Sequence, residues 1–188
     1  MESIKAFDEG LFRLLNLEFI HPLLDILMPW ITEPKNFYLF FAAISLVLVV
    51  WGGRRGRKAL LLVLITLLIT DQSTSFLKEQ LQRVRPCNAV ENARVLIGCT
   101  HSFSLPSAHA ANIFGVAAII SFIFKKFSPV FLFIAFLVAY SRIYVGVHYP
   151  LDVLAGSWLG LFSAAVILLI EKEIYKMKIP SVWKLNRR

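Results

Sequence analysis

Five long blocks of apolar residues, separated by short polar or basic stretches, constrain this chain more than any other feature. They cover about residues 35–52, 59–81, 105–124, 128–147 and 150–170. An α-helix needs roughly 20 such residues to cross about 30 Å of hydrocarbon, and each block reaches or approaches that length with its flanks. Of the 188 residues, 57% are hydrophobic and 17% are charged, whereas soluble domains average about 25% charged. The sequence therefore predicts an integral membrane protein.

The first 34 residues are more mixed in character. Apolar residues recur there at helical spacing opposite charged ones, which is typical of an amphipathic helix at the membrane surface; they are Phe7, Leu11, Leu14, Leu15 and Phe19. Residues 20–32 are more apolar but contain Asp25 and two prolines, so they either span weakly or only dip into the bilayer. Because no linker or repeat divides the chain, we expect one all-α domain over residues 1–188. This polytopic membrane protein would be a bundle of five to six transmembrane helices with an N-terminal amphipathic segment.

The basic residues are distributed unevenly between the loops. If the loop Gly52–Lys58 lies inside, 12 of the 20 Lys and Arg residues fall on that side and six fall on the opposite face. The positive-inside rule favours this orientation. Despite the net charge of +8, the composition argues against a nucleic-acid partner. The basic tail after Glu171 is expected either to lie along the inner leaflet or to be solvated.

Three polar clusters fall on the outer side of this topology. Lys78 and Arg85 are seven residues apart, so they are expected to share one helix face, with Pro86 ending the helix. In the second cluster, Pro106 suits the first position of a helix. The free backbone N–H groups that follow would bind an anion there; they belong to Ser107, Ala108 and His109.

The third cluster contains Arg142, His148 and Asp152. Pro150 is expected to begin a helix, which places the Asp152 carboxylate in its first turn, within reach of a ring nitrogen of His148. Taken singly, each of these residues is more simply a snorkelling charge or a structural histidine. Taken together, three cations, a helix N-terminus and two histidines at one membrane face indicate a phosphate site with a nucleophile and an acid.

The three clusters closely resemble the tripartite motif of the type 2 phosphatidic acid phosphatase superfamily, the lipid phosphate phosphatases. The resemblance spans residues 78–152, and the surrounding pattern of helices fits the six-helix bundle of that family. The middle motif of the family usually reads Pro-Ser-Gly-His, and here Ala108 replaces the glycine. A first helical turn with negative φ tolerates the added methyl group, so the substitution need not abolish activity.

This resemblance implies a role for each matching residue. His148 would be the nucleophile that forms a phosphohistidine, with Asp152 orienting it. His109 would protonate the leaving group and later activate water. The phosphate would be bound by Lys78, Arg85, Ser107, Ala108 and Arg142. No metal and no cofactor is expected, because the cations supply the charge.

Two further features lie near these motifs. Cys87 and Cys99 both fall in the outer loop between the first two motifs, where an oxidising compartment would allow a disulfide. The alternatives are two free thiols or a metal site built from Cys99 and His101. Asp71 lies in an apolar block, so it should face protein or be protonated, and it would either pack structurally or tune Lys78.

The sequence thus predicts a metal-independent hydrolase that removes phosphate from a membrane phospholipid or glycolipid. The active site would face the periplasm or exterior from the inner (cytoplasmic) membrane. Lipid A 1-phosphate and undecaprenyl pyrophosphate are the favoured substrates, with phosphatidylglycerophosphate and phosphatidic acid as alternatives. A lipid-to-lipid phosphotransferase and an anion transporter are the competing functions.

Overall fold

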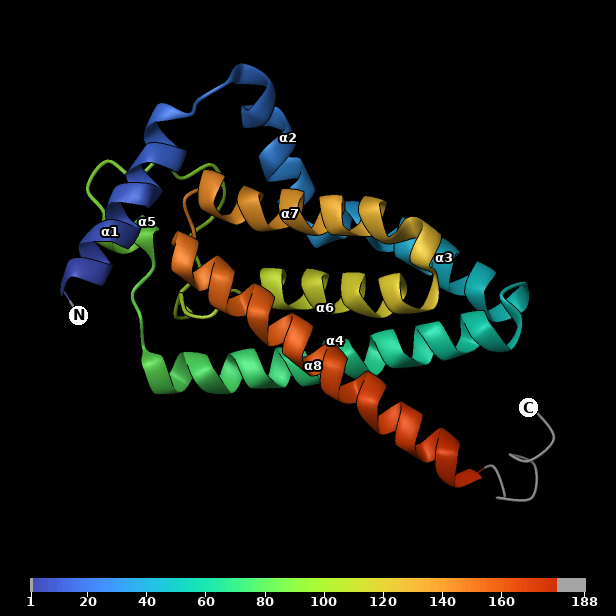
Figure 1. The fold of residues 1–188 in the computed structure, drawn as a ribbon. Coiled ribbons are helices and arrows are strands. Elements are labelled where there is room, and N and C mark those ends of the chain that lie inside the picture. The colour runs from blue at the N-terminus through green and yellow to red at the C-terminus, as the bar shows by residue number, and fades with distance from the viewer. Residues whose placement is uncertain (1, 179–188) are drawn as a thin grey trace.

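The fold is a bundle of helices, described by a computed structural model over residues 2–178, and no β-strand occurs in that part of the chain. Its long helices are α4 (Gly53–Leu81), α6 (Ala108–Ile123), α7 (Ser128–Tyr144) and α8 (Pro150–Lys178). Figure 1 shows α6 in the middle of the bundle, and it packs against each of the other three. The predicted all-α class is confirmed.

The central contact between α6 and α8 depends on small residues. A Cβ atom added at Gly156 would overlap the carbonyl oxygen of Ser107, and one added at Gly160 would overlap that of Ala111. Only glycine permits this close backbone approach, which is a common device for packing helices in membranes. The first turn of α6 is therefore held directly against the second and third turns of α8.

Three stretches are long and apolar enough to cross a membrane, namely Gly53–Ala89, Lys125–Tyr144 and Pro150–Met177. The helices α2 (Pro22–Thr32) and α3 (Tyr38–Val50) pass the same test only together, and the chain bends by 76° between them, where the short turn Pro34–Phe37 intervenes. With 16 residues, α6 is shorter than a full span. The chain is a multi-pass membrane protein, but the predicted count of five to six spans is not confirmed by these lengths.

The N-terminal helix α1 (Glu2–Arg13) continues into a π-helical turn, Leu14–Glu18, and packs against α8. Its inward face carries Asp8, Phe12 and Asn16, which are completely buried. The apolar side chains of Ile4 and Phe7 are exposed instead. The amphipathic pattern indicated a helix here, but two polar side chains lie on the face that packs into the protein.

The two ends of the bundle differ in character. At one end, Lys58 near the start of α4 pairs with Glu171 of α8, with Nζ and Oε1 2.6 Å apart. The polar clusters gather at the other end, where α4 and α7 finish and α6 and α8 begin. The far end of the predicted basic tail, residues 179–188, lies outside the described residues.

Candidate active site

The first motif is shaped by the way in which α4 ends. The helix stops at Leu81 because Gln82 adopts a left-handed conformation with φ of 45°. Arg85 therefore lies in the following loop, and Pro86 begins the short helix α5 (Pro86–Ala89). The prediction that Lys78 and Arg85 share one helix face is wrong for this reason. The turn at Gln82 allows the loop to run back toward the start of α8.

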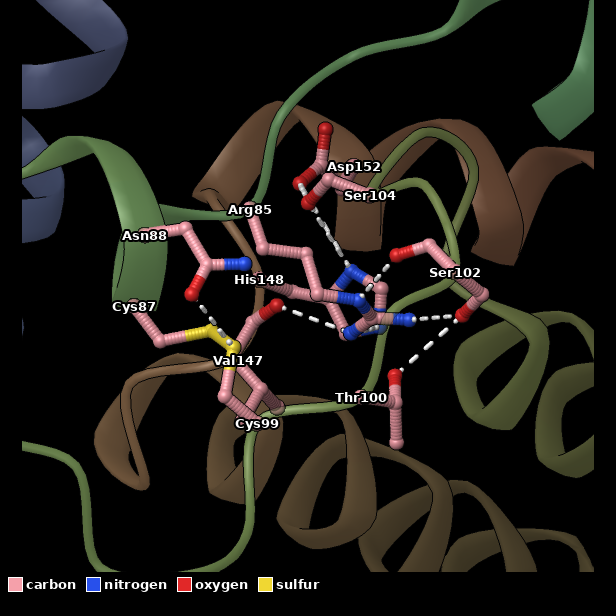
Figure 2. Close-up of a disulfide and its surroundings, with 10 residues drawn as sticks. All are labelled: Arg85, Cys87, Asn88, Cys99, Thr100, Ser102, Ser104, Val147, His148 and Asp152. Carbon is pink, nitrogen blue, oxygen red and sulfur yellow. Dashed lines mark hydrogen bonds and ion pairs between the residues drawn. A yellow bond between two sulfur atoms is a disulfide. The ribbon is translucent and has the colours of Figure 1, made fainter.

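Arg85 holds the loops around it together, as Figure 2 shows. Its Nε donates to the carbonyl oxygen of Ser102 at 2.7 Å, and its Nη2 donates to the Ser102 hydroxyl at 2.9 Å. Its Nη1 donates to the carbonyl oxygen of Val147 at 3.0 Å and lies 3.1 Å from Nε2 of His148. Because a guanidinium can only donate, Nε2 must accept, and the proton of the neutral ring resides on Nδ1.

The other ring nitrogen of His148 faces two oxygen atoms. Nδ1 lies 3.4 Å from the Ser104 hydroxyl and 3.6 Å from Oδ2 of Asp152. The Ser104 hydroxyl donates to the same Asp152 oxygen, so it is free to accept from Nδ1. The expected approach of Asp152 to His148 is thus at ion-pair distance, and Ser104 completes the hydrogen-bonded link. Nothing in a single sequence distinguishes Ser104 from the other serines of this loop.

His148 is 1% exposed. Burial lowers the pKa of its imidazole, the nearby Asp152 carboxylate raises it, and the positive charges of Arg142 and Arg85 lower it. The net result is a pKa of about 3. The ring is therefore neutral at physiological pH, which is the form that a nucleophilic nitrogen requires.

Three more candidate residues surround the His148 site from other helices, namely Lys78 of α4, His109 of α6 and Arg142 of α7. His109, in the first turn of α6, lies within electrostatic range of His148, Arg142 and Lys78. Arg142, which is 7% exposed, donates to the Thr32 hydroxyl on α2. Its Nε is buried without a hydrogen-bond partner within residues 2–178. Since Lys78, Arg85 and Arg142 repel one another, an anion bound between them would be strongly favoured.

The start of α6 differs in detail from the prediction. Ser107 is the N-cap, with its hydroxyl accepting from the N–H of Ala110 at 3.5 Å, and Pro106 precedes the cap instead of opening the helix. The Ser107 N–H is not free, because it donates to the carbonyl oxygen of Asp152 at 2.9 Å. Because α6 packs closely on α8, this N–H is already hydrogen-bonded within the protein. For the N–H groups of Ala108 and His109, the described chain offers no partner, so they remain candidates for binding an anion.

The loop between the first two motifs is closed by a disulfide between Cys87 and Cys99, which Figure 2 shows together with Arg85. Asp71 accepts a hydrogen bond at 2.7 Å from the Asn112 side chain of α6. This hydrogen bond joins α4 to α6.

Sequence reasoning missed two charged residues behind Asp152. Arg83 donates from Nη1 to Oδ1 of Asp152 at 2.7 Å and from Nη2 to Oδ2 of Asp8 at 2.6 Å. The only sequence signal for Asp8 is its spacing with Phe12 and Asn16, which puts the three side chains on one face of α1 and the π-helical turn that follows it.

Known proteins resemble this chain in sequence and in fold. Residues 58–176 match the PAP2 superfamily. An undecaprenyl-diphosphatase of Sulfolobus acidocaldarius is 31% identical over 166 residues, which cover 86% of this chain and 79% of that protein. A lipid A 4'-phosphatase of Bacteroides thetaiotaomicron is 32% identical over 120 residues, which cover 60% of this chain but only 53% of the longer relative. The crystal structure of a transmembrane PAP2-type phosphatidylglycerolphosphate phosphatase of Bacillus subtilis is similar with a TM-score of 0.73 at 25% identity, covering 93% of this chain and 89% of that one.

Proposed function

This chain belongs to the PAP2 superfamily, and on that premise we propose that it is a membrane lipid phosphate phosphatase. The resemblance of residues 78–152 to the family is confirmed. Residues 1–188 form one domain with five to six membrane-spanning segments in this proposal. The observation that carries it is the setting of His148, with Arg85 on one ring nitrogen and Ser104 and Asp152 on the other.

In the first step, Nε2 of His148 attacks the phosphorus of the bound lipid phosphate. The bond between phosphorus and the lipid oxygen breaks, and His109, which carries a proton while the anionic phosphate lies beside it, gives that proton to the oxygen. Arg85 transfers its hydrogen bond from Nε2 to a phosphoryl oxygen, where Lys78 and Arg142 also neutralise charge. Charge-assisted hydrogen bonds of this kind are about twice as strong as neutral ones. Preorganised donors are usually the largest single source of catalysis.

In the second step, water attacks the phosphohistidine while His109 accepts a proton from it. The bond between phosphorus and Nε2 breaks, inorganic phosphate leaves, and His148 returns to its neutral form. While the phosphohistidine exists, the ring carries a positive charge, which the Asp152 carboxylate stabilises. The three basic side chains supply the charge that a metal ion would otherwise supply, so we expect turnover to continue in EDTA.

The site is proposed to face the periplasm or exterior from the inner (cytoplasmic) membrane. The positive-inside rule supports this orientation, because a cluster of basic residues lies at the opposite end of the bundle, namely Arg54, Arg55, Arg57, Lys58, Lys125 and Lys126. The bilayer retains the lipid tails while the headgroup reaches the polar end of the bundle. The relatives' names favour undecaprenyl pyrophosphate and a lipid A phosphate as substrates, with phosphatidylglycerophosphate as the alternative supported by the solved structure.

A phosphate-release assay in detergent micelles tests the proposal. The purified protein is given each of these lipids and phosphatidic acid, with EDTA present, and a His148→Ala variant serves as the control. We expect release from at least one lipid and none from the variant. Transfer of phosphate to an added acceptor lipid, with no inorganic phosphate released, would instead identify a phosphotransferase. A variant with full activity would remove His148 from the mechanism.

A further inference from the structure

A chain of buried charges connects the N-terminal helix to the catalytic pair. Asp8 of α1 and Asp152 of α8 are both completely buried, and the guanidinium of Arg83 lies between their carboxylates. The nitrogen–oxygen distances are 2.6 Å to Asp8 and 2.7 Å to Asp152. The three residues are separated by more than 60 positions along the sequence, since Arg83 is 75 residues from Asp8 and 69 from Asp152.

Two further contacts fix this arrangement. The second carboxylate oxygen of Asp8 accepts from the N–H of Leu151 at 2.9 Å, in the first turn of α8. The guanidinium of Arg83 also lies over the ring of Tyr149, with its central carbon 4.0 Å from the ring centroid. Both carboxylate oxygens of Asp8 and both terminal nitrogens of Arg83 are thus bonded, and both residues contact the segment that carries His148 and Asp152.

We propose that Asp8 and Arg83 are positioning residues, which hold the Asp152 carboxylate against His148 and preserve its negative charge during the reaction. One guanidinium shared between two carboxylates leaves a net charge of −1 on the group. That charge offsets the positive charge which His148 carries as a phosphohistidine. The inference rests on the proposed function, and it makes α1 a part of the active site.

The charges of Asp8 and Arg83 have opposite effects on the negative charge that faces His148. Without the charge of Asp8, Arg83 would neutralise Asp152 alone, and less negative charge would face the imidazole. Without Arg83, two buried carboxylates would face it with no cation between them. The other charged groups directed at His148 stay unchanged in either case; they are Arg85 from the loop after α4, Arg142 from α7 and His109 from α6.

The test compares Asp8→Asn and Arg83→Gln with Arg83→Lys and a control, Glu9→Gln. Glu9 is the neighbour of Asp8 on α1, but its carboxylate pairs with Arg13, 2.9 Å away at the protein surface. For each protein, kcat, the pH profile of kcat/KM and the melting temperature are measured on the lipid that the wild type hydrolyses. We expect kcat to fall by up to about 100-fold in Asp8→Asn and Arg83→Gln, the loss that follows from a misplacement of about 1 Å. Arg83→Lys should recover part of it, and Glu9→Gln should be unchanged.

The pH profile separates positioning from simple loss of stability. The acid limb of kcat/KM should move to higher pH in Arg83→Gln and to lower pH in Asp8→Asn. The double variant should lose no more kcat than the worse single one, because both act through Asp152. Normal kcat and an unmoved acid limb in folded Asp8→Asn and Arg83→Gln would overturn the inference. If wild type and His148→Ala are equally inactive on every lipid, the proposed function itself has failed.

Discussion

The substitution Arg85→Lys tests whether the site needs only a positive charge at this position or also the planar shape of the guanidinium. The change keeps one positive charge near His148 but replaces a planar group that donates in three directions. In the structure that group satisfies the carbonyl oxygens of Ser102 and Val147 and also reaches Nε2 of His148. A single ammonium on a flexible stem cannot make all three contacts at once.

The expected losses follow from these contacts. Removing one preorganised donor from developing phosphoryl charge lowers kcat by about 100- to 1,000-fold. In addition, a buried acceptor left without its donor costs about 1–3 kcal/mol of stability. The Lys variant leaves at least one of the two carbonyl oxygens in that state, so its melting temperature should fall as well. If charge alone mattered, kcat would remain close to that of the wild type.

Initial rates of phosphate release and melting curves for the purified proteins provide the measurement. Arg57→Lys is the matched control, because Arg57 is exposed at the opposite end of α4. We expect the control to behave like the wild type. A kcat within about threefold of the wild type for Arg85→Lys, well short of the loss for a missing donor, would refute the assignment of Arg85 as a geometric donor to the phosphoryl group.

Three further outcomes are expected. Ser104→Ala should lower kcat by about tenfold, the equivalent of one hydrogen bond to a charged group. Asp152→Asn should lower kcat by about 10,000-fold, as in a catalytic triad. Equal losses for the two variants in phosphate-release assays would contradict this ranking. Because burial lowers the pKa of His148 to about 3, the ring should stay neutral as the pH falls from 7 to 5, and NMR of the labelled imidazole showing protonation near pH 6.5 would disprove this. Replacing Cys87 and Cys99 by serine should lower the free energy of unfolding by about 3 kcal/mol, since their disulfide closes a loop of 12 residues. A wild-type denaturation curve that reductant leaves unchanged would contradict this.

The helices and the motif residues could be predicted because their signals are local. Apolar blocks mark the helices, and the spacing from Lys78 to Asp152 indicates a phosphate site. The end of α4 was misjudged because helical periodicity does not show where the chain turns. Gln82 in the left-handed region moves Arg85 off the helix, and no residue type at that position signals the turn.

The residues that support the catalytic pair could not be predicted for a different reason. Ser104, Arg83 and Asp8 acquire their roles only when α1, the loop after α4 and the start of α8 meet. Asp8 in particular resembles an ordinary surface charge on an amphipathic helix until its burial is known. The bend between α2 and α3 has a local signal instead, because Glu33, Pro34 and Lys35 interrupt the apolar residues there.

The most direct test of the proposed chemistry is to trap the covalent intermediate. The enzyme is mixed rapidly with a lipid phosphate, denatured under alkaline conditions that preserve phosphorus–nitrogen bonds, digested and examined by mass spectrometry. We expect phosphate on the peptide that contains His148, formed within one turnover and absent from His148→Ala. Phosphate attached to another residue, or turnover without any phosphoenzyme in wild type and variant alike, would contradict it.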